Sequence, residues 1–248
     1  MRLEDVIRGI PKTELIYWRD SYTKRFRANI LRNDVEKSNA YLILDKTAFH
    51  PKSGGQPTDT GVIQNTGFNL KVKKTMFFRG VVIHWGKYEG KPSEDKAIGE
   101  IDWEKRYLYM KRHTGGHLLD HCLTIVTGVP VKTTDAWHGE ECYVGYQGDP
   151  PKTEIVNKAV ELANSCIKNG AQVKIEFISH DELLMRSPPA PNIYRLPHLK
   201  IYRIVTIEGC KPIPCGGTHV KDIKEIICFS LNKVKENKLG YRVYYDVQ

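Results

Sequence analysis

Residues 102–130 read DWEKRYLYMKRHTGGHLLDHCLTIVTGVP, and this stretch organises the second half of the chain. Asp102 is a suitable N-cap residue, and Gly128 followed by Pro130 is a stop signal. Between them, apolar side chains recur at helical spacing: Leu108, Leu118, Leu119, Leu123 and Val126. The pattern predicts one long amphipathic helix. Gly115 and Gly116 lie inside this helix, where each glycine costs about 1 kcal/mol of helix stability relative to Ala. We therefore expect another backbone or a ligand to approach closely there.

The segments on either side of this helix predict an α+β protein. Before it, short apolar runs at 41–44, 62–63 and 81–85 are bounded by turn residues, a pattern typical of a small barrel or sandwich, and we expect a β-barrel-like N-terminal domain, residues 1–100. Residues 90–93 look like a linker or surface loop. After the helix, we expect an α+β domain, residues 101–248, with helices packed on a mainly antiparallel sheet. Its predicted elements are helices at 153–168 and after the Ser179–Glu182 capping box, and strands at 173–178, 201–207, 226–231 and 241–247, the last two forming a hairpin.

Charge and composition narrow the class of protein. The 248 residues include 38 Lys+Arg and 29 Asp+Glu, a net charge of +9, which suits a polyanionic partner such as nucleic acid. The sequence has no run of 18 consecutive apolar residues, so we expect no membrane-spanning helix. Two acidic residues near the start argue against a signal peptide. We therefore expect a folded, cytoplasmic protein. Most of the six cysteines are predicted to be buried thiols rather than a disulfide framework.

Two histidine motifs predict a metal site. His113 and His117 are four residues apart, on one face of the long helix, so both can reach one ion. His121 continues the stripe but cannot share an ion with His113, because eight residues rise about 12 Å along a helix. One ion would therefore be bound either by His113 and His117 or by His117 and His121. Thr114 follows His113 where a zinc protease would have Glu.

The second motif places a thiol and an imidazole around a glycine pair. Cys215 and His219 flank Gly216 and Gly217, whose freedom permits a tight turn that aims both ligands at one point. Nitrogen and sulfur ligands together are the set that zinc prefers. The two motifs in combination therefore predict a zinc site.

Three stretches then identify a family resemblance. Residues 47–61 read TAFHPKSGGQPTDTG, residues 112–119 read RHTGGHLL, and residues 215–220 read CGGTHV. In this order they resemble the AlaX family, free-standing relatives of the alanyl-tRNA synthetase editing domain, in its longer type with a Gly-Gly-Gln N-terminal domain. The resemblance runs from about residue 13 to 235. His50 and Lys52 depart from the usual Tyr and acid, changes that could alter the tRNA contact or the domain packing.

The resemblance carries a function and a ligand set. It implies hydrolysis, in trans, of mischarged tRNA(Ala), chiefly Ser-tRNA(Ala) and also Gly-tRNA(Ala). It also implies that zinc is held by four residues and not by His121: His113, His117, Cys215 and His219. Four protein ligands are typical of a structural zinc, whereas a catalytic zinc keeps an open position. The sequence leaves open whether zinc activates water or only organises the pocket.

Further site residues follow from the same resemblance. Gln56 is expected where the N-terminal domain meets the editing half, reaching toward the aminoacyl end, with Gly54 and Gly55 permitting a close approach. Thr134, or Thr133 in its place, is expected to meet the serine hydroxyl and so disfavour alanine.

Basic side chains of the long helix are expected to contact acceptor-end phosphates: Lys105, Arg106, Lys111 and Arg112.

Other functions remain open at this level. A Ser-tRNA(Thr) editing module of the threonyl-tRNA synthetase type has similar ligands but would lack the Gly-Gly-Gln domain. A non-catalytic, zinc-dependent tRNA-binding protein is a second alternative, and a small-ester metallohydrolase would explain neither the charge nor the N-terminal domain. We do not expect a ligase, because 248 residues cannot also hold an adenylation domain. The sequence does not distinguish a monomer from a homodimer.

Overall fold

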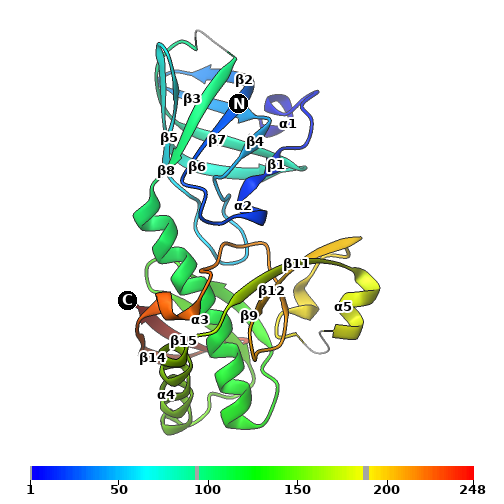
Figure 1. The fold of residues 1–248 in the computed structure, drawn as a ribbon, viewed down its shortest axis with the longest axis vertical. Helices are drawn as coiled ribbons and strands as arrows, with labels where there is room; N and C mark the ends of the chain where they lie inside the picture. Colours follow the sequence, from blue (N-terminus) through cyan, green and yellow to red (C-terminus); the bar gives the residue numbers. More distant parts are fainter. Residues whose placement is uncertain (1, 93–94, 187–189) are drawn as a thin grey trace. The chain divides into compact units, whose positions relative to one another are not determined.

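The computed structural model describes residues 2–92, 95–186 and 190–248, and it confirms an α+β fold with a closed barrel (Figure 1). The chain forms two compact units, Met1–Ser53 with Pro57–Tyr107 and Gly54–Gln56 with Leu108–Gln248. Among the described residues, no helix has the length and hydropathy needed to cross a membrane.

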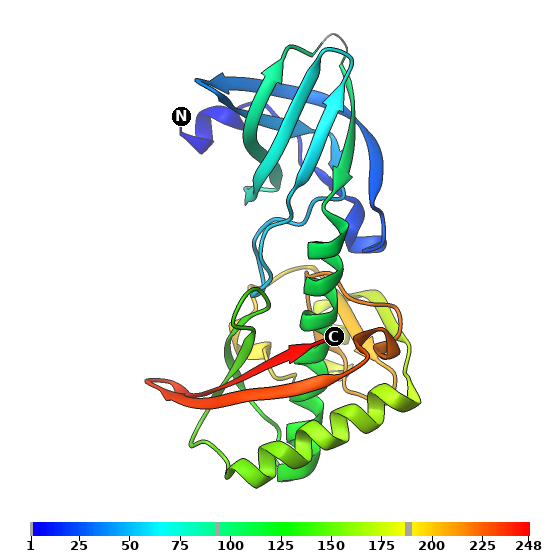
Figure 2. The ribbon, with the colours of Figure 1, turned by 90° about the vertical axis from the view of Figure 1, so that its left-hand side faces the viewer.

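Six antiparallel strands close the barrel of the first unit in the order β2-β3-β7-β6-β5-β8 (Figure 2). They are β2 (Arg25–Glu36), β3 (Asn39–Leu44), β5 (Gly61–Asn65), β6 (Phe68–Phe78), β7 (Val81–Gly90) and β8 (Lys96–Ile101). Side chains alternate along each strand: on β2, Phe26 and Ala28 are buried while Arg25 and Arg27 are exposed. Inward side chains such as Leu42, Ile63 and Leu70 form the core. The barrel predicted for this part of the chain is confirmed.

The start of the chain covers an apolar patch on the barrel. Helix α1 (Leu3–Val6) buries Val6 against Ile43 and Ile83. Arg32 of β2 donates hydrogen bonds to the carbonyl oxygens of Val6 (2.8 Å) and Arg8 (3.0 Å), which ties this segment down. Three further short elements complete the unit: β1 (Glu14–Leu15), α2 (Ile16–Arg19) and β4 (Lys46–Thr47).

A buried ion pair links the 47–61 motif to the start of the long helix. Arg106 is fully buried, pairs with Asp59, and donates to the carbonyl oxygens of Ser21 and Ala48. A buried guanidinium needs such a complete set of partners, because an unpaired buried charge is very costly. The prediction that Arg106 contacts tRNA phosphates is therefore wrong.

The predicted long helix is α3 (Trp103–Thr127). A Cβ added to Gly115 would lie 3.2 Å from the Val247 side chain, and one added to Gly116 would lie 2.8 Å from the Tyr245 hydroxyl. The close approach predicted at these glycines is therefore made by side chains, those of the last strand among them, and not by another backbone.

Two antiparallel sheets surround α3 in the second unit. The four-stranded sheet has the order β14-β15-β10-β9, and the three-stranded sheet has the order β11-β12-β13. The strands are β9 (Thr133–Trp137), β10 (Tyr143–Gln147), β11 (Val173–Ser179), β12 (Ile201–Ile207), β13 (Ile213–Pro214), β14 (Phe229–Asn237) and β15 (Gly240–Val247). The helical elements are α4 (Thr153–Asn169), α5 (His180–Arg186), η1 (Ile193–Arg195) and η2 (Ile223–Ile226). The Ser179 hydroxyl accepts from the Glu182 amide (3.2 Å), which confirms the predicted start of α5.

Some predicted boundaries differ from the structure. The strand expected at 226–231 begins only at Phe229, because Asp222 and Glu225 form a capping box that starts η2 instead. Strands β9 and β10 were not predicted, since they are short and a bulge interrupts their alternation. Gly90 ends β7, and the connection after it leads to β8 within the barrel; Ser93 lies outside the described residues.

Candidate metal centre

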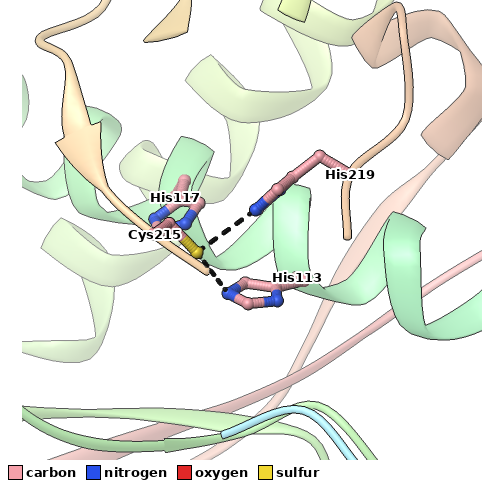
Figure 3. Close-up of side chains that lie close together, drawn as sticks. All are labelled: His113, His117, Cys215 and His219. Atoms are coloured by element: carbon pink, nitrogen blue, oxygen red, sulfur yellow. Dashed lines mark hydrogen bonds between the residues drawn. The ribbon is translucent and has the colours of Figure 1, made fainter. Parts of the chain in front are cut away.

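Four side chains of the second unit converge on one point (Figure 3). His113 and His117 project from α3, whereas Cys215 and His219 lie on the segment after β13. The ligand atoms of all four lie within 4.8 Å of one another. The Cys215 sulfur is 3.3 Å from Nε2 of His113 and 3.3 Å from Nε2 of His219. The structure thus brings together the two motifs that the sequence singled out.

A hydrogen-bonded glutamine orients His113. Gln56 is fully buried, and its Oε1 accepts from the Thr218 amide (3.0 Å), which defines the orientation of its own amide. The same Oε1 lies 3.0 Å from Nδ1 of His113, and Gln56 Nε2 donates to Thr218 Oγ1 (2.8 Å). Because Oε1 can only accept, His113 carries its proton on Nδ1 and presents the Nε2 lone pair to the cluster.

A threonine sets the orientation of His219 in the same way. The Thr114 hydroxyl donates to the Met110 carbonyl (2.9 Å), so it must accept from His219 Nδ1, 3.1 Å away. His219 therefore also presents an Nε2 lone pair. Thr114, the residue that argued against a zinc protease, therefore orients His219 in this structure.

His117 is held differently. Its Nδ1 is 3.9 Å from the buried carboxylate of Asp120, and its Nε2 is a buried atom that makes no hydrogen bond within the described part of the chain. Three imidazole nitrogens and one sulfur that meet in this way form a donor set suited to zinc. The orphaned Nε2 is the kind of atom that a bound cation would satisfy.

Electrostatics favour opposite charges on His117 and Cys215. Burial alone would lower the pKa of His117, but its attraction to Asp120 and Cys215 outweighs burial and raises the pKa to about 9. Burial raises the pKa of Cys215, yet His117 and Arg203 bring it below the ordinary value of a thiol. Burial lowers the pKa of the neighbouring His138 to about 3. The thiolate that metal binding requires is therefore favoured here.

Two glycines leave room for these contacts. A Cβ on Gly217 would lie 2.2 Å from Cε1 of His113. Gly55 has a left-handed backbone (φ +78°), and a Cβ there would lie 2.6 Å from the Ala136 carbonyl oxygen. Its own carbonyl accepts from the His138 amide (2.8 Å). The Gly54–Gln56 loop is thereby anchored to β9 and to the cluster.

The cluster lies on the wall of a cavity of about 420 Å³ in the second unit. The cavity is lined by ligands His113, His117 and Cys215, by loop residues Gly54 and Gly55, and by several residues from β9 and the segment before β12. His121 instead lines a separate, more apolar cavity of about 380 Å³. His121 is therefore not one of the four convergent ligands. Of those four, His117 also lines this second cavity.

The two predicted threonines face different surroundings. Thr133 is buried and lines the first cavity; its hydroxyl donates to the Pro191 carbonyl (3.2 Å) and accepts from Arg195 Nη2 (2.8 Å). Thr134 is not among the described residues that line this cavity. Its hydroxyl donates to the Asp135 carboxylate (3.2 Å), and both side chains lie next to Gly145. The bulge in β9 explains the difference, because it shifts the alternation of side chains at this position. Of the two, Thr133, the alternative, lines the cavity, and a role of either threonine in selectivity stays a prediction.

Sequence reasoning missed two residues of the cavity. Asn192 donates from Nδ2 to the Pro214 carbonyl (2.7 Å), and its buried Oδ1 makes no hydrogen bond to the rest of the described chain. Arg195 lines the same cavity and donates to the Thr134 carbonyl (3.0 Å). Asn192 precedes the short helix η1 and Arg195 ends it, and this segment has no spacing pattern in the sequence, so only the tertiary structure reveals them.

Arg112, predicted to bind substrate, is engaged within the unit. Its Nε donates to Asp246 (2.9 Å) and its Nη1 to the Gly139 carbonyl (2.6 Å), and the side chain is 12% exposed. A phosphate would have to compete with these partners, and a role of Arg112 in substrate binding stays a prediction.

Comparisons with known proteins find one matching family model and two groups of relatives. A family model described as tRNA synthetases class II (A) matches residues 16–105. The chain is 34% identical to the alanyl-tRNA editing protein AlaX-M of Saccharolobus solfataricus, over 95% of this chain and 99% of that protein. It is 29% identical to AlaX-M of Methanosarcina mazei, over 95% of this chain and 96% of that protein.

A second group of relatives is much longer. The alanine–tRNA ligase of Pyrobaculum aerophilum is 29% identical over 92% of this chain, but the match covers 26% of the ligase. The chain therefore spans about a quarter of the length of such ligases and nearly all of the AlaX-M proteins. The chain belongs to the AlaX family of alanyl-tRNA editing proteins.

Proposed function

We propose that this protein is an aminoacyl-tRNA deacylase that hydrolyses mischarged tRNA(Ala) in trans, chiefly Ser-tRNA(Ala) and also Gly-tRNA(Ala). The observation that carries the proposal is the convergence of His113, His117, Cys215 and His219 at a cavity large enough for an aminoacyl end. Membership of the AlaX family supports the substrate, and the net charge of +9 suits a tRNA partner in the cytoplasm.

The four ligands would hold one zinc ion. The donor set, the two oriented Nε2 lone pairs and the orphaned Nε2 of His117 all fit this metal. When bound, zinc would supply a Lewis-acid charge that can polarise a carbonyl or orient water. Gln56 and Thr114 would act as positioning residues for His113 and His219, rather than touching the substrate.

The residues of the cavity would recognise the aminoacyl group. The vacant acceptor Asn192 Oδ1 can take a hydrogen bond from the substrate ammonium group or from the serine hydroxyl. Thr133 Oγ1 is fixed by Pro191 and Arg195, so its remaining lone pair is preorganised for the serine hydroxyl. Arg195 places a positive charge beside the cavity, where it would stabilise negative charge that develops on the ester carbonyl oxygen.

The chain would divide this work between two domains. We assign residues 1–100 to an N-terminal domain and residues 101–248 to the editing domain, with the Gly54–Gln56 loop supplied to the metal centre. Gly54 and Gly55 line the cavity and would contact the substrate through their backbone.

Deacylation of Ser-, Gly- and Ala-tRNA(Ala), with and without a zinc chelator, tests the proposal. We expect fast release of serine, release of glycine, slow release of alanine, and loss of activity when the chelator removes zinc. Binding of all three tRNAs without release of any amino acid would instead support a non-catalytic tRNA-binding protein.

A further inference from the structure

The four-stranded sheet of the second unit has one buried face and one open face. Alternation along β15 buries Tyr241, Val243, Tyr245 and Val247, and this buried face packs against α3 at Gly115 and Gly116. Arg242 and Tyr244 point to the opposite face. In Figure 2 the β14–β15 hairpin crosses in front of α3. Side chains on the face of the hairpin that is turned away from α3 are therefore accessible to a partner.

Strand register places three aromatic side chains in one row of this face. Trp137 of β9 pairs with Tyr143 of β10, Tyr143 pairs with Tyr244 of β15, and Tyr244 pairs with Lys233 of β14. The ring centroids of Tyr143 and Tyr244 are 5.2 Å apart, and all three aromatic residues are half-buried. One row thus crosses all four strands. We call the surface formed by Trp137, Tyr143, Tyr244, Lys233, Lys235 and Arg242 the aromatic face.

Cations lie over and beside these rings. Lys233 Nζ is 4.7 Å from the centroid of the Tyr244 ring, and the Arg242 guanidinium carbon is 4.3 Å from that of Tyr143. In the next row Lys235 pairs directly with Arg242, a like-charge pair that destabilises a sheet. Asp135 pairs with Arg242 and Glu141 pairs with Lys233 (3.3 Å), but Lys235 makes no ion pair with the described residues. An added anion would offset this repulsion.

This combination matches the chemistry of a single-stranded nucleic acid. Bases stack on aromatic side chains that stand on a sheet, and two or three bases are bound in this way on a four-stranded sheet. Basic side chains among the rings contact the phosphates. Asp135 belongs to the same strand face and also lines the cavity of the metal centre, so a strand bound here would end beside that cavity.

We propose that the aromatic face binds a single-stranded segment of RNA, with bases stacked on Tyr143 and Tyr244 and phosphates beside Lys233 and Lys235. The proposal rests on the proposed function, because the single-stranded 3′ end of a tRNA is the segment that must lie next to the cavity during deacylation.

Fluorescence anisotropy with a labelled 12-nucleotide RNA that ends in ACCA, and carries no amino acid, tests the proposal. Tyr143→Leu and Tyr244→Leu should each raise Kd about 5- to 100-fold, since each stacked base contributes strongly to affinity. Phe77→Leu, at an exposed aromatic of the barrel, is the matched control and should leave Kd unchanged. Lys235→Gln should reduce the slope of log K against log salt concentration by about 0.7, whereas Lys158→Gln on α4 should not.

Several outcomes would overturn the proposal. Thermal melting checks that the variants are folded. If both tyrosine variants keep Kd within about twofold of the parent protein, or if Phe77→Leu weakens binding equally, the aromatic face does not bind RNA. If sedimentation shows that the two tyrosine variants convert a dimer to a monomer while Kd for the RNA stays constant, the aromatic face binds a second copy of the chain instead.

The oligonucleotide has no ester, so the two proposals fail separately. Tyrosine-dependent RNA binding without deacylation would support the aromatic face and refute the proposed function. Deacylation by all variants with an unchanged KM, together with unchanged Kd for the oligonucleotide, would refute the aromatic face and leave the proposed function standing.

Discussion

Gln56 offers the sharpest test of how the metal centre is built. Its side chain is fully buried and makes three hydrogen bonds, to His113 Nδ1 (3.0 Å), the Thr218 amide (3.0 Å) and Thr218 Oγ1 (2.8 Å). Gln56→Leu keeps a similar volume and removes all three. His113 can then protonate Nε2 instead of Nδ1, and the lone pair that faces the cluster is no longer fixed.

The size of the effect follows from these contacts. Loss of an outer partner of a metal-ligating histidine costs about 10- to 100-fold in metal affinity, or about 1.4–2.7 kcal/mol. The buried Thr218 amide is also left without a partner, which should lower the free energy of unfolding by about 1–3 kcal/mol. Gln56→Glu is the matched variant, because a carboxylate still accepts from His113 Nδ1 and from Thr218. We expect it to restore most of the zinc affinity.

Zinc affinity, measured by competition with a chromophoric chelator, checks this prediction, and urea unfolding measures the stability. If Gln56→Leu binds zinc within about twofold of the parent protein, Gln56 does not orient His113. If Gln56→Glu binds zinc as weakly as Gln56→Leu, the contact matters through packing rather than through hydrogen bonding.

Three further outcomes are expected. Cys215→Ala should remove zinc from the purified protein and His121→Ala should not, as metal analysis would show; the reverse result would contradict the ligand assignment. Thr133→Val should lower the ratio of Ser-tRNA(Ala) to Ala-tRNA(Ala) deacylation rates about 5- to 150-fold, because an unpaired buried polar group costs about 1–3 kcal/mol, while Thr134→Val and the rate with Gly-tRNA(Ala) should show little change. Burial in the barrel lowers the pKa of His84 to about 4 from 6.5, so stability is complete above pH 6.5 and falls as the unfolded chain takes up a proton below it. Urea unfolding should show a loss between pH 7 and pH 5 that is about 2 kcal/mol larger for the parent protein than for His84→Gln, and equal losses would disprove this linkage.

Local patterns in the sequence were sufficient for the main elements and for the ligand types. The period of apolar residues predicted α3 and α4, because a helix buries one face of its own sequence whatever it packs against. The four-residue spacing of His113 and His117 determined that both share one helix face. Three ordered motifs were enough to recognise the AlaX family, and a relative 34% identical over 95% of the chain confirms it.

Contacts between distant segments were decided only by the tertiary structure. Cys215 and His113 are 102 residues apart, so no local rule could show that their ligand atoms meet. Arg106 reads as a surface cation on a helix, yet its burial depends on Asp59 being folded against it. A bulge in β9 reverses which of Thr133 and Thr134 faces the cavity, and strand register alone aligns Trp137, Tyr143 and Tyr244 in one row. The sequence by itself determined which chemical groups this protein carries and on which elements; only folding, through register and long-range packing, decided which of them meet.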